Sequence, residues 1–127
     1  MVLVDTSVWV DHLKRTSAKL GELLEQGEVV IHPFVVGELA CGNLRNRHEI
    51  LSLLHSLPDV PRAEDDEILF FIERHFLAGK GLGLIDAHLL ASGQMGDHLL
   101  WTRDKHLKAV AEALGMDFGQ QSAADDT

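Results

Sequence analysis

Short apolar runs that stop near a carboxylate, each followed by a helical pattern, constrain the fold of this chain most. Val2–Val4 stops at Asp5, and SVWVDHLK (7–14) then places apolar residues at helical spacing. HLLWT (98–102) stops close to Asp104 in the same way, and EVVIH (28–32) reads as another short strand. Because strands alternate with helices, we expect one α/β domain with a central, mostly parallel sheet.

The helices are predicted from apolar periodicity and from their start and stop signals. Gly27 and Gly115 suit helix ends, Pro33 suits a first turn, and Asn46 with Glu49 resembles a capping box. GKGLG breaks the helical pattern at 79–83. Helices are expected over 7–14, 16–27, 33–40, 46–57, 64–78, 85–95 and 104–114.

The helix expected over 64–78 carries two apolar stripes. One consists of Ile68, Phe71, Ile72 and Phe76. Phe70 and Leu77 form the second, seven residues apart. Since a surface helix needs only one apolar face, the second stripe is either core or an interface with a partner.

Composition and charge narrow the class of protein. The net charge of −9 argues against a simple nucleic-acid binder, which usually has a basic surface. The chain has neither an apolar run long enough to span a bilayer nor a signal-peptide pattern. Its single cysteine, Cys41, fits a reducing cytoplasm or a plain buried thiol. We therefore expect a cytoplasmic domain over residues 1–118, followed by a disordered acidic tail, 119–127.

Four carboxylates stand where a parallel α/β sheet binds ligands, outside the carboxyl ends of its strands. Asp5 and Asp104 follow strands, Asp86 begins a helix, and Glu38 lies one turn into a helix. Each has a plainer interpretation, because the aspartates could be helix caps and Glu38 a solvated charge. Together, four acids without another obvious catalytic group suit Mg²⁺ or Mn²⁺, which activate water and hold phosphate oxygens.

Other kinds of site have weaker support. The eight histidines form no HExxH motif and there is no cysteine pair, so zinc is not indicated, and we expect these histidines dispersed over the surface or interfaces. GKGLG lacks the ending of a P-loop, and Ser7 lacks the context of a nucleophilic serine.

Four stretches resemble the acidic motifs of PIN-domain ribonucleases, and most closely those of VapC toxins from bacterial and archaeal toxin–antitoxin pairs. They are VDTSVWVDH, GELACG, LIDAHLLA and WTRDKHL, in the order and spacing of that family from Val2 to about Phe118. The resemblance implies a PIN-like three-layer α/β/α sandwich. It also implies a metal-dependent endoribonuclease that uses metal-activated water to cleave a phosphodiester, leaving a 5′-phosphate and a 3′-hydroxyl.

The resemblance assigns the acidic quartet and its cofactor. Asp5 and Asp86 would be the main ligands of Mg²⁺ (or Mn²⁺). Glu38 and Asp104 would complete the catalytic cluster, directly or through bound water.

The same motifs imply supporting residues. Thr6 or Ser7 would steady Asp5 or a metal-bound water, and Thr102 matches the hydroxyl of a T-x-D motif. Leu107 departs from the aromatic residue that the family often has there, which changes packing only. Candidate contacts to RNA phosphates, each otherwise a solvated charge, are Lys14, Arg15, Arg45, Arg47, Lys80, Arg103 and Lys105.

The resemblance also implies partners. They are an RNA substrate, a second copy of the chain in a homodimer, and a VapB-type antitoxin that wraps the toxin in a larger hetero-oligomer. Basic residues of such an antitoxin would complement the charge of −9. No membrane is implied.

Three alternatives remain open. A haloacid-dehalogenase-type phosphatase, another metal-dependent phosphoryl-transfer enzyme, needs a second aspartate where Ser7 stands. A receiver-like module expects an acidic pair after the first strand, where Asp5 stands alone. A catalytically silent PIN-like binding module is the third, and the intact quartet speaks against it.

Overall fold

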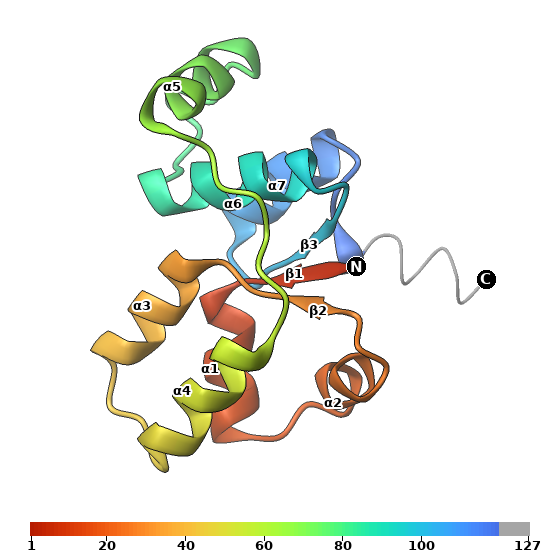
Figure 1. Cartoon of the computed structure of the whole chain (residues 1–127). Coiled ribbons are helices and arrows are strands. Elements are labelled where there is room, and N and C mark those ends of the chain that lie inside the picture. Colours follow the sequence, from red (N-terminus) through yellow and green to blue (C-terminus); the bar gives the residue numbers. More distant parts are fainter. Residues whose placement is uncertain (120–127) are drawn as a thin grey trace, which may run out of the picture.

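The computed structural model describes residues 1–119 and contains, within them, three strands and seven helices (Figure 1). The strands are β1 (Val2–Val4), β2 (Val29–Val30) and β3 (Leu99–Trp101). The helices are α1 (Thr6–Lys14), α2 (Ala18–Glu25), α3 (Pro33–Cys41), α4 (Arg47–Ser56), α5 (Asp65–Arg74), α6 (Leu84–Met95) and α7 (Lys105–Ala113). Except for Gly119, the tail expected over 119–127 lies outside the described residues.

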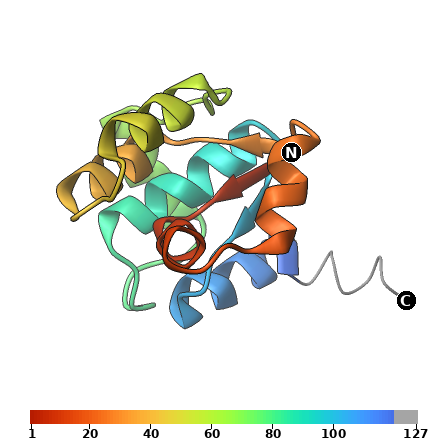
Figure 2. The ribbon, with the colours of Figure 1, turned by 90° about the horizontal axis from the view of Figure 1, so that it is seen from below.

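The three strands form one parallel sheet in the order β2-β1-β3. Val2 pairs with Val29, and Val4 pairs with Trp101. Figure 1 shows α6 and α7 on the side of β3 and α1 to α4 on the side of β2, and Figure 2 shows the strands enclosed between helices. The expected α/β sandwich with a mostly parallel sheet is confirmed. Because all strands run the same way, their carboxyl ends meet at one edge.

The core is centred on β1 and α6. Leu3 is fully buried in the central strand. Seven consecutive residues of α6, from Ala87 to Gly93, are buried. A side chain at Gly93 would place its Cβ 2.7 Å from Cε of Met116, so the end of the Met116 side chain would have to shift to admit it. A helix buried this completely holds Asp86, in its first turn, at a defined place.

The end of α5 differs from the prediction. The helix stops at Arg74, and Phe76 adopts the left-handed conformation with φ 55°. Leu77 is buried in the core at 6% exposure, whereas Phe70 is 66% and Phe76 80% exposed. The predicted second stripe is therefore wrong, because Phe70 and Leu77 do not share one face of a helix. The place of Phe76 in the first stripe is wrong too, because the chain reverses direction after α5.

Three smaller predictions are also wrong. Asn46 precedes α4 with left-handed φ and makes no side-chain capping bond, so the capping box with Glu49 is absent. Cys41 is exposed and not a buried thiol. His32 and His88 are buried and pack with ring centroids 6.2 Å apart, so the histidines are not all at the surface. Solvent exposure of single residues depends on packing that the sequence pattern does not specify.

The burial of β1 makes a testable prediction. Leu3→Ala is expected to lower the free energy of unfolding by about 2–5 kcal/mol, because it leaves a cavity in the central strand. Chemical denaturation measures this. Leu69→Ala, at a helical position that is 63% exposed, is the matched control and should change stability by less than about 0.5 kcal/mol. Equal effects of the two substitutions would contradict the described core.

Candidate active site

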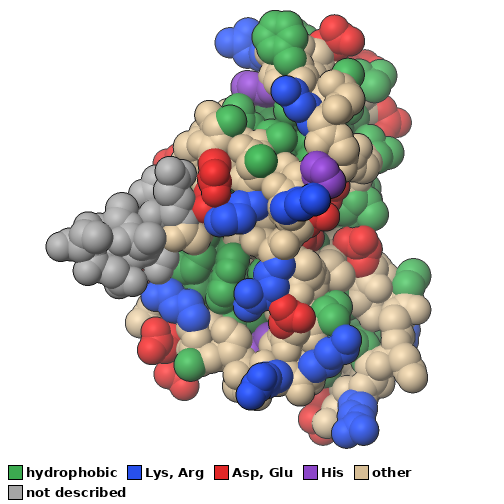
Figure 3. Space-filling view, turned by 180° about the vertical axis from the view of Figure 1, so that it is seen from behind, with side chains coloured by type: hydrophobic (Ala, Val, Ile, Leu, Met, Phe, Trp, Pro, Cys, Tyr) green, Lys and Arg blue, Asp and Glu red, His purple; other side chains and the backbone are tan. Residues whose placement is uncertain are grey.

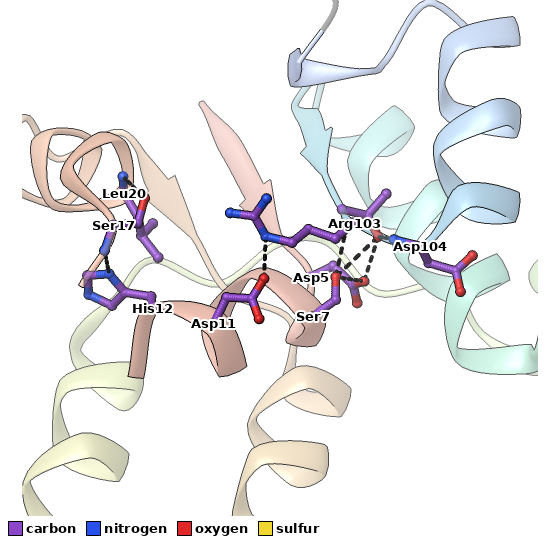
Figure 4. Close-up of polar contacts among 9 residues, drawn as sticks. Asp5, Ser7, Asp11, His12, Ser17, Leu20, Arg103 and Asp104 are labelled. Atoms are coloured by element: carbon purple, nitrogen blue, oxygen red, sulfur yellow. Dashed lines mark hydrogen bonds and ion pairs between the residues drawn. The ribbon is translucent and has the colours of Figure 1, made fainter. Parts of the chain in front are cut away.

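Asp5 lies at the carboxyl end of β1 and is 7% exposed (Figure 4). Its Oδ1 accepts a hydrogen bond from the backbone N–H of Thr6 at 2.8 Å. Its Oδ2 accepts from the hydroxyls of Ser7 at 2.9 Å and Thr102 at 2.7 Å. Burial of a carboxylate is costly without such partners, so these donors both stabilise Asp5 and set its orientation.

Asp104 follows β3 and is exposed. Its Oδ1 accepts from the backbone N–H groups of His106 and Leu107, so it is the N-cap of α7. Its own backbone N–H donates to the Thr102 hydroxyl at 3.1 Å. Thr102 therefore connects Asp104 to Asp5 through a single side chain.

Glu38 approaches from α3. It is exposed, and its Oε1 accepts a hydrogen bond from the hydroxyl of Thr6 at 2.6 Å. Thr6 follows Asp5 directly, so this bond brings the α3 carboxylate to the end of β1. The two hydroxyl residues after Asp5 thus divide their roles, since Ser7 holds Asp5 and Thr6 holds Glu38.

Asp86 lies in the first turn of α6, where its Oδ2 accepts from the backbone N–H of Gly83 at 3.0 Å. Its pKa is raised above the ordinary 3.8, first because burial disfavours the charged form. The Gly83 hydrogen bond opposes this shift, while the negative charges of Asp5, Asp104 and Glu38 add to it. All four acids therefore interact electrostatically at one place.

The four carboxylates suit a divalent ion in donor chemistry and in charge. Mutual repulsion, visible in the raised pKa of Asp86, is what a bound cation would relieve. Within residues 1–119, however, no three acidic, histidine or cysteine side chains are grouped to hold a metal ion as they stand. Each acid is instead turned toward its own hydrogen-bond donor. A hydrated ion held by one or two carboxylates, as Mg²⁺ prefers, would not need such a group.

The basic candidates are distributed unevenly around the acids. Arg103 extends over α1, where its Nε lies 2.6 Å from Oδ2 of Asp11, while its backbone N–H donates to the Ser7 hydroxyl (Figure 4). Lys14 and Arg45 line a groove of about 780 Å³ together with Glu38. Arg47 donates to the carbonyl of Gly42, Arg15 is exposed, and Lys80 and Lys105 line a different groove.

Sequence reasoning missed two residues that position this site. Asp11 pairs with Arg103, and the stretch VWVDH carries no sign of that partner. His32 is the N-cap of α3, the helix of Glu38, and its Nδ1 accepts from the N–H of Phe34 at 3.0 Å. Burial lowers the pKa of His32 to about 4, which keeps this nitrogen free to accept. The sequence does contain a signal for this cap, because His32 directly precedes Pro33 and proline suits the first position of a helix.

Comparison with known proteins identifies the family of the chain. The family model of the PIN domain matches residues 2–113. The chain belongs to the PIN-domain family and, within it, to the VapC group. It is 44% identical to Ribonuclease VapC32 of Mycobacterium tuberculosis strain CDC 1551 / Oshkosh over 122 residues, which are 95% of this chain and 98% of that protein. The same values hold for Ribonuclease VapC32 of strain ATCC 25618 / H37Rv.

The capping role of Asp104 is testable by comparing two substitutions that both remove its charge. Asp104→Asn keeps an oxygen that accepts from the first turn of α7, whereas Asp104→Ala does not. We expect the alanine variant to be less stable than the asparagine variant by about 1 kcal/mol in chemical denaturation. Equal stability would show that the cap contributes nothing.

The raised pKa of Asp86 predicts a pH dependence of stability. The folded protein binds the Asp86 proton more tightly than the unfolded chain, so ionisation of Asp86 lowers stability as pH rises from 3.8 through the raised pKa. In EDTA at pH 7, Asp86→Asn should therefore unfold at a higher temperature than the wild type. This advantage should shrink as the pH falls toward 3.8.

The matched control is Asp97→Asn. Asp97 is exposed with φ 56°, a conformation that asparagine tolerates, and its substitution should leave the unfolding temperature nearly unchanged. An Asp86→Asn variant no more stable than the wild type at pH 7 would contradict the described electrostatics.

Proposed function

We propose that this protein is a metal-dependent endoribonuclease that hydrolyses phosphodiester bonds of RNA and acts as the toxin of a toxin–antitoxin pair. The observation that carries the proposal is the hydrogen-bonded arrangement of Asp5, Glu38 and Asp104 around Thr6 and Thr102. Asp86 is near enough for their negative charges to add to the rise in its pKa. Membership in the PIN-domain family and similarity to proteins named ribonucleases support it.

Asp5 and Asp86 are proposed to hold the ion, with Glu38 and Asp104 acting on it directly or through water. Mg²⁺ or Mn²⁺ bound there would supply charge neutralisation, activation of water and contacts to phosphate oxygens. The hydroxyls of Ser7 and Thr102 keep Asp5 oriented, and the hydroxyl of Thr6 does so for Glu38. No side chain need form a covalent intermediate.

Basic side chains near the acids are proposed to contact the phosphates that flank the cut. Arg103 and Lys105 adjoin Asp104 in sequence, and Lys14 and Arg15 end α1. Arg103 is the main candidate because its ion pair with Asp11 is half exposed and can exchange for a phosphate. These cations would attract the anionic RNA to a protein whose net charge is −9.

We propose two protein partners as well. A VapB-type antitoxin would supply basic residues that complement the acidic site, and a second copy of the chain would form a homodimer within the larger complex. No helix in residues 1–119 is long and apolar enough to cross a membrane. A cytoplasmic location, where RNA and antitoxin are made, is part of the proposal.

Cleavage of RNA by the purified, antitoxin-free protein tests the function. Total cellular RNA is incubated with Mg²⁺ or Mn²⁺ or with EDTA, and the new ends are sequenced. We expect discrete cuts with 5′-phosphate and 3′-hydroxyl ends that require the metal. Asp5→Asn and Asp86→Asn should each reduce the rate by more than about 100-fold, because even the residues that orient metal ligands contribute 10- to 100-fold.

Asp97→Asn is the control for these two variants and should cleave RNA like the wild type. The thermal unfolding of each variant shows whether it is folded. No cuts in any RNA by a folded protein would sink the proposal and favour the silent binding module. Full activity in Asp5→Asn or Asp86→Asn would remove that residue from the site.

A further inference from the structure

A groove of about 490 Å³ lies between the segment that follows α5 and the exposed side of α7. Phe76 and Lys80 line it from the first of these elements, and Lys105, His106 and Val110 line it from α7. Its size falls in the range of ligand sites. It shares none of its lining residues with the acidic quartet.

The charge of this groove is opposite to that of the whole protein. Among the described residues that line it, two are lysines, two are histidines and none is acidic. The chain as a whole has 20 acidic against 11 basic residues. Figure 3 views the molecule from behind Figure 1, on the side of α7, and shows basic side chains spaced down this face from the α5 end. A cationic groove on an acidic protein suits an anionic ligand.

Phe76 is held in a conformation that phenylalanine rarely adopts. Its N–H donates to the carbonyl of Glu73 and the N–H of Leu77 to that of Ile72, the pattern that ends a helix at a left-handed residue. Glycine usually occupies this position, because a side chain is strained at φ 55°. The ring is nevertheless 80% exposed and gains little from packing. An exposed aromatic ring at the edge of a cationic groove offers a surface on which a base can stack.

The groove leads into the proposed active site along both of its walls. Lys105 directly follows Asp104. On the other wall, Gly81 lies so close to His106 of α7 that a Cβ on it would be 2.9 Å from the imidazole. Two residues later, the N–H of Gly83 donates to Asp86. An RNA strand with its scissile phosphate at the acids would therefore pass Lys105 to reach the groove.

We propose that this groove binds the single-stranded RNA on one side of the scissile phosphate, with one base stacked on Phe76 and phosphates at Lys80 and Lys105. The inference rests on the proposed ribonuclease function and names a part of its substrate site. The apolar floor around Val110 faces the ribose and base, and the lysines face the backbone. Such combinations of cations and aromatic rings are typical of single-strand binding.

Binding is measured with a fluorescein-labelled 12-nucleotide single-stranded RNA that contains the cut site mapped for the wild type. All proteins carry Asp86→Asn so that the RNA stays intact, and fluorescence anisotropy gives the affinity. Phe76→Gly should weaken binding roughly tenfold while it leaves the unfolding temperature equal or higher, because the backbone strain is relieved. Lys80→Gln should lower the slope of log affinity against log salt by about 0.7.

The matched controls are Phe70→Ala, which removes an exposed ring outside the groove, and Lys19→Gln, which removes an exposed cation on α2. Neither should change the affinity. Phe76→Asn is a second variant without the ring and, like Phe76→Gly, should weaken RNA binding. Its side chain tolerates left-handed backbone.

Failure of the proposed function and failure of the proposed groove give different results. If the wild type cleaves no RNA, the function itself fails. If the wild type cleaves RNA and both Phe76 variants and Lys80→Gln bind the oligonucleotide like the parent, the groove is not part of the substrate site. Unchanged RNA binding combined with lost retention of a co-expressed antitoxin would assign the groove to a protein and overturn the proposal.

Discussion

The buried carboxylate of Asp5 connects the first strand–helix unit of the chain to the last. Its Oδ2 accepts from the hydroxyls of Ser7 and Thr102, and its backbone N–H donates to the carbonyl of Trp101 at the end of β3. A carboxylate can be buried only where such donors replace water. This set of hydrogen bonds joins the points at which α1 and α7 leave the sheet, and Thr102 extends it to the backbone of Asp104.

For the aspartates, helix capping is compatible with a role in the proposed site. Asp5 and Asp104 both bind the backbone N–H groups of the helices that follow them, and Asp86 accepts from the residue before α6. Cap geometry places each carboxylate at a helix N-terminus, and in a parallel sheet those termini lie near the carboxyl ends of the strands. Burial raises the pKa of Asp86, and the negative charges of the other carboxylates add to this rise.

Most of the elements were predictable from the sequence because their signals are local. Three strands, the helix that begins at Pro33 and the break at 79–83 follow from periodicity and from glycine and proline. The errors at helix ends fall where a residue other than glycine adopts left-handed backbone, as Asn46 and Phe76 do. The side chain of Phe76 gives no signal of a helix end, so the apolar pattern predicts a helix that continues through Phe76 and Leu77.

By itself, the sequence determined the order of strands and helices, the four carboxylates available to the site and the hydroxyls beside them. These properties are set by residue chemistry and by spacing along a short stretch of chain. Only the tertiary structure decided that Thr102 orients Asp5, that Asp11 holds Arg103, and that Leu77 is core while Phe70 and Phe76 face solvent. The physical reason is that each of these outcomes depends on how distant segments pack or where the chain reverses, and local periodicity carries no information about either.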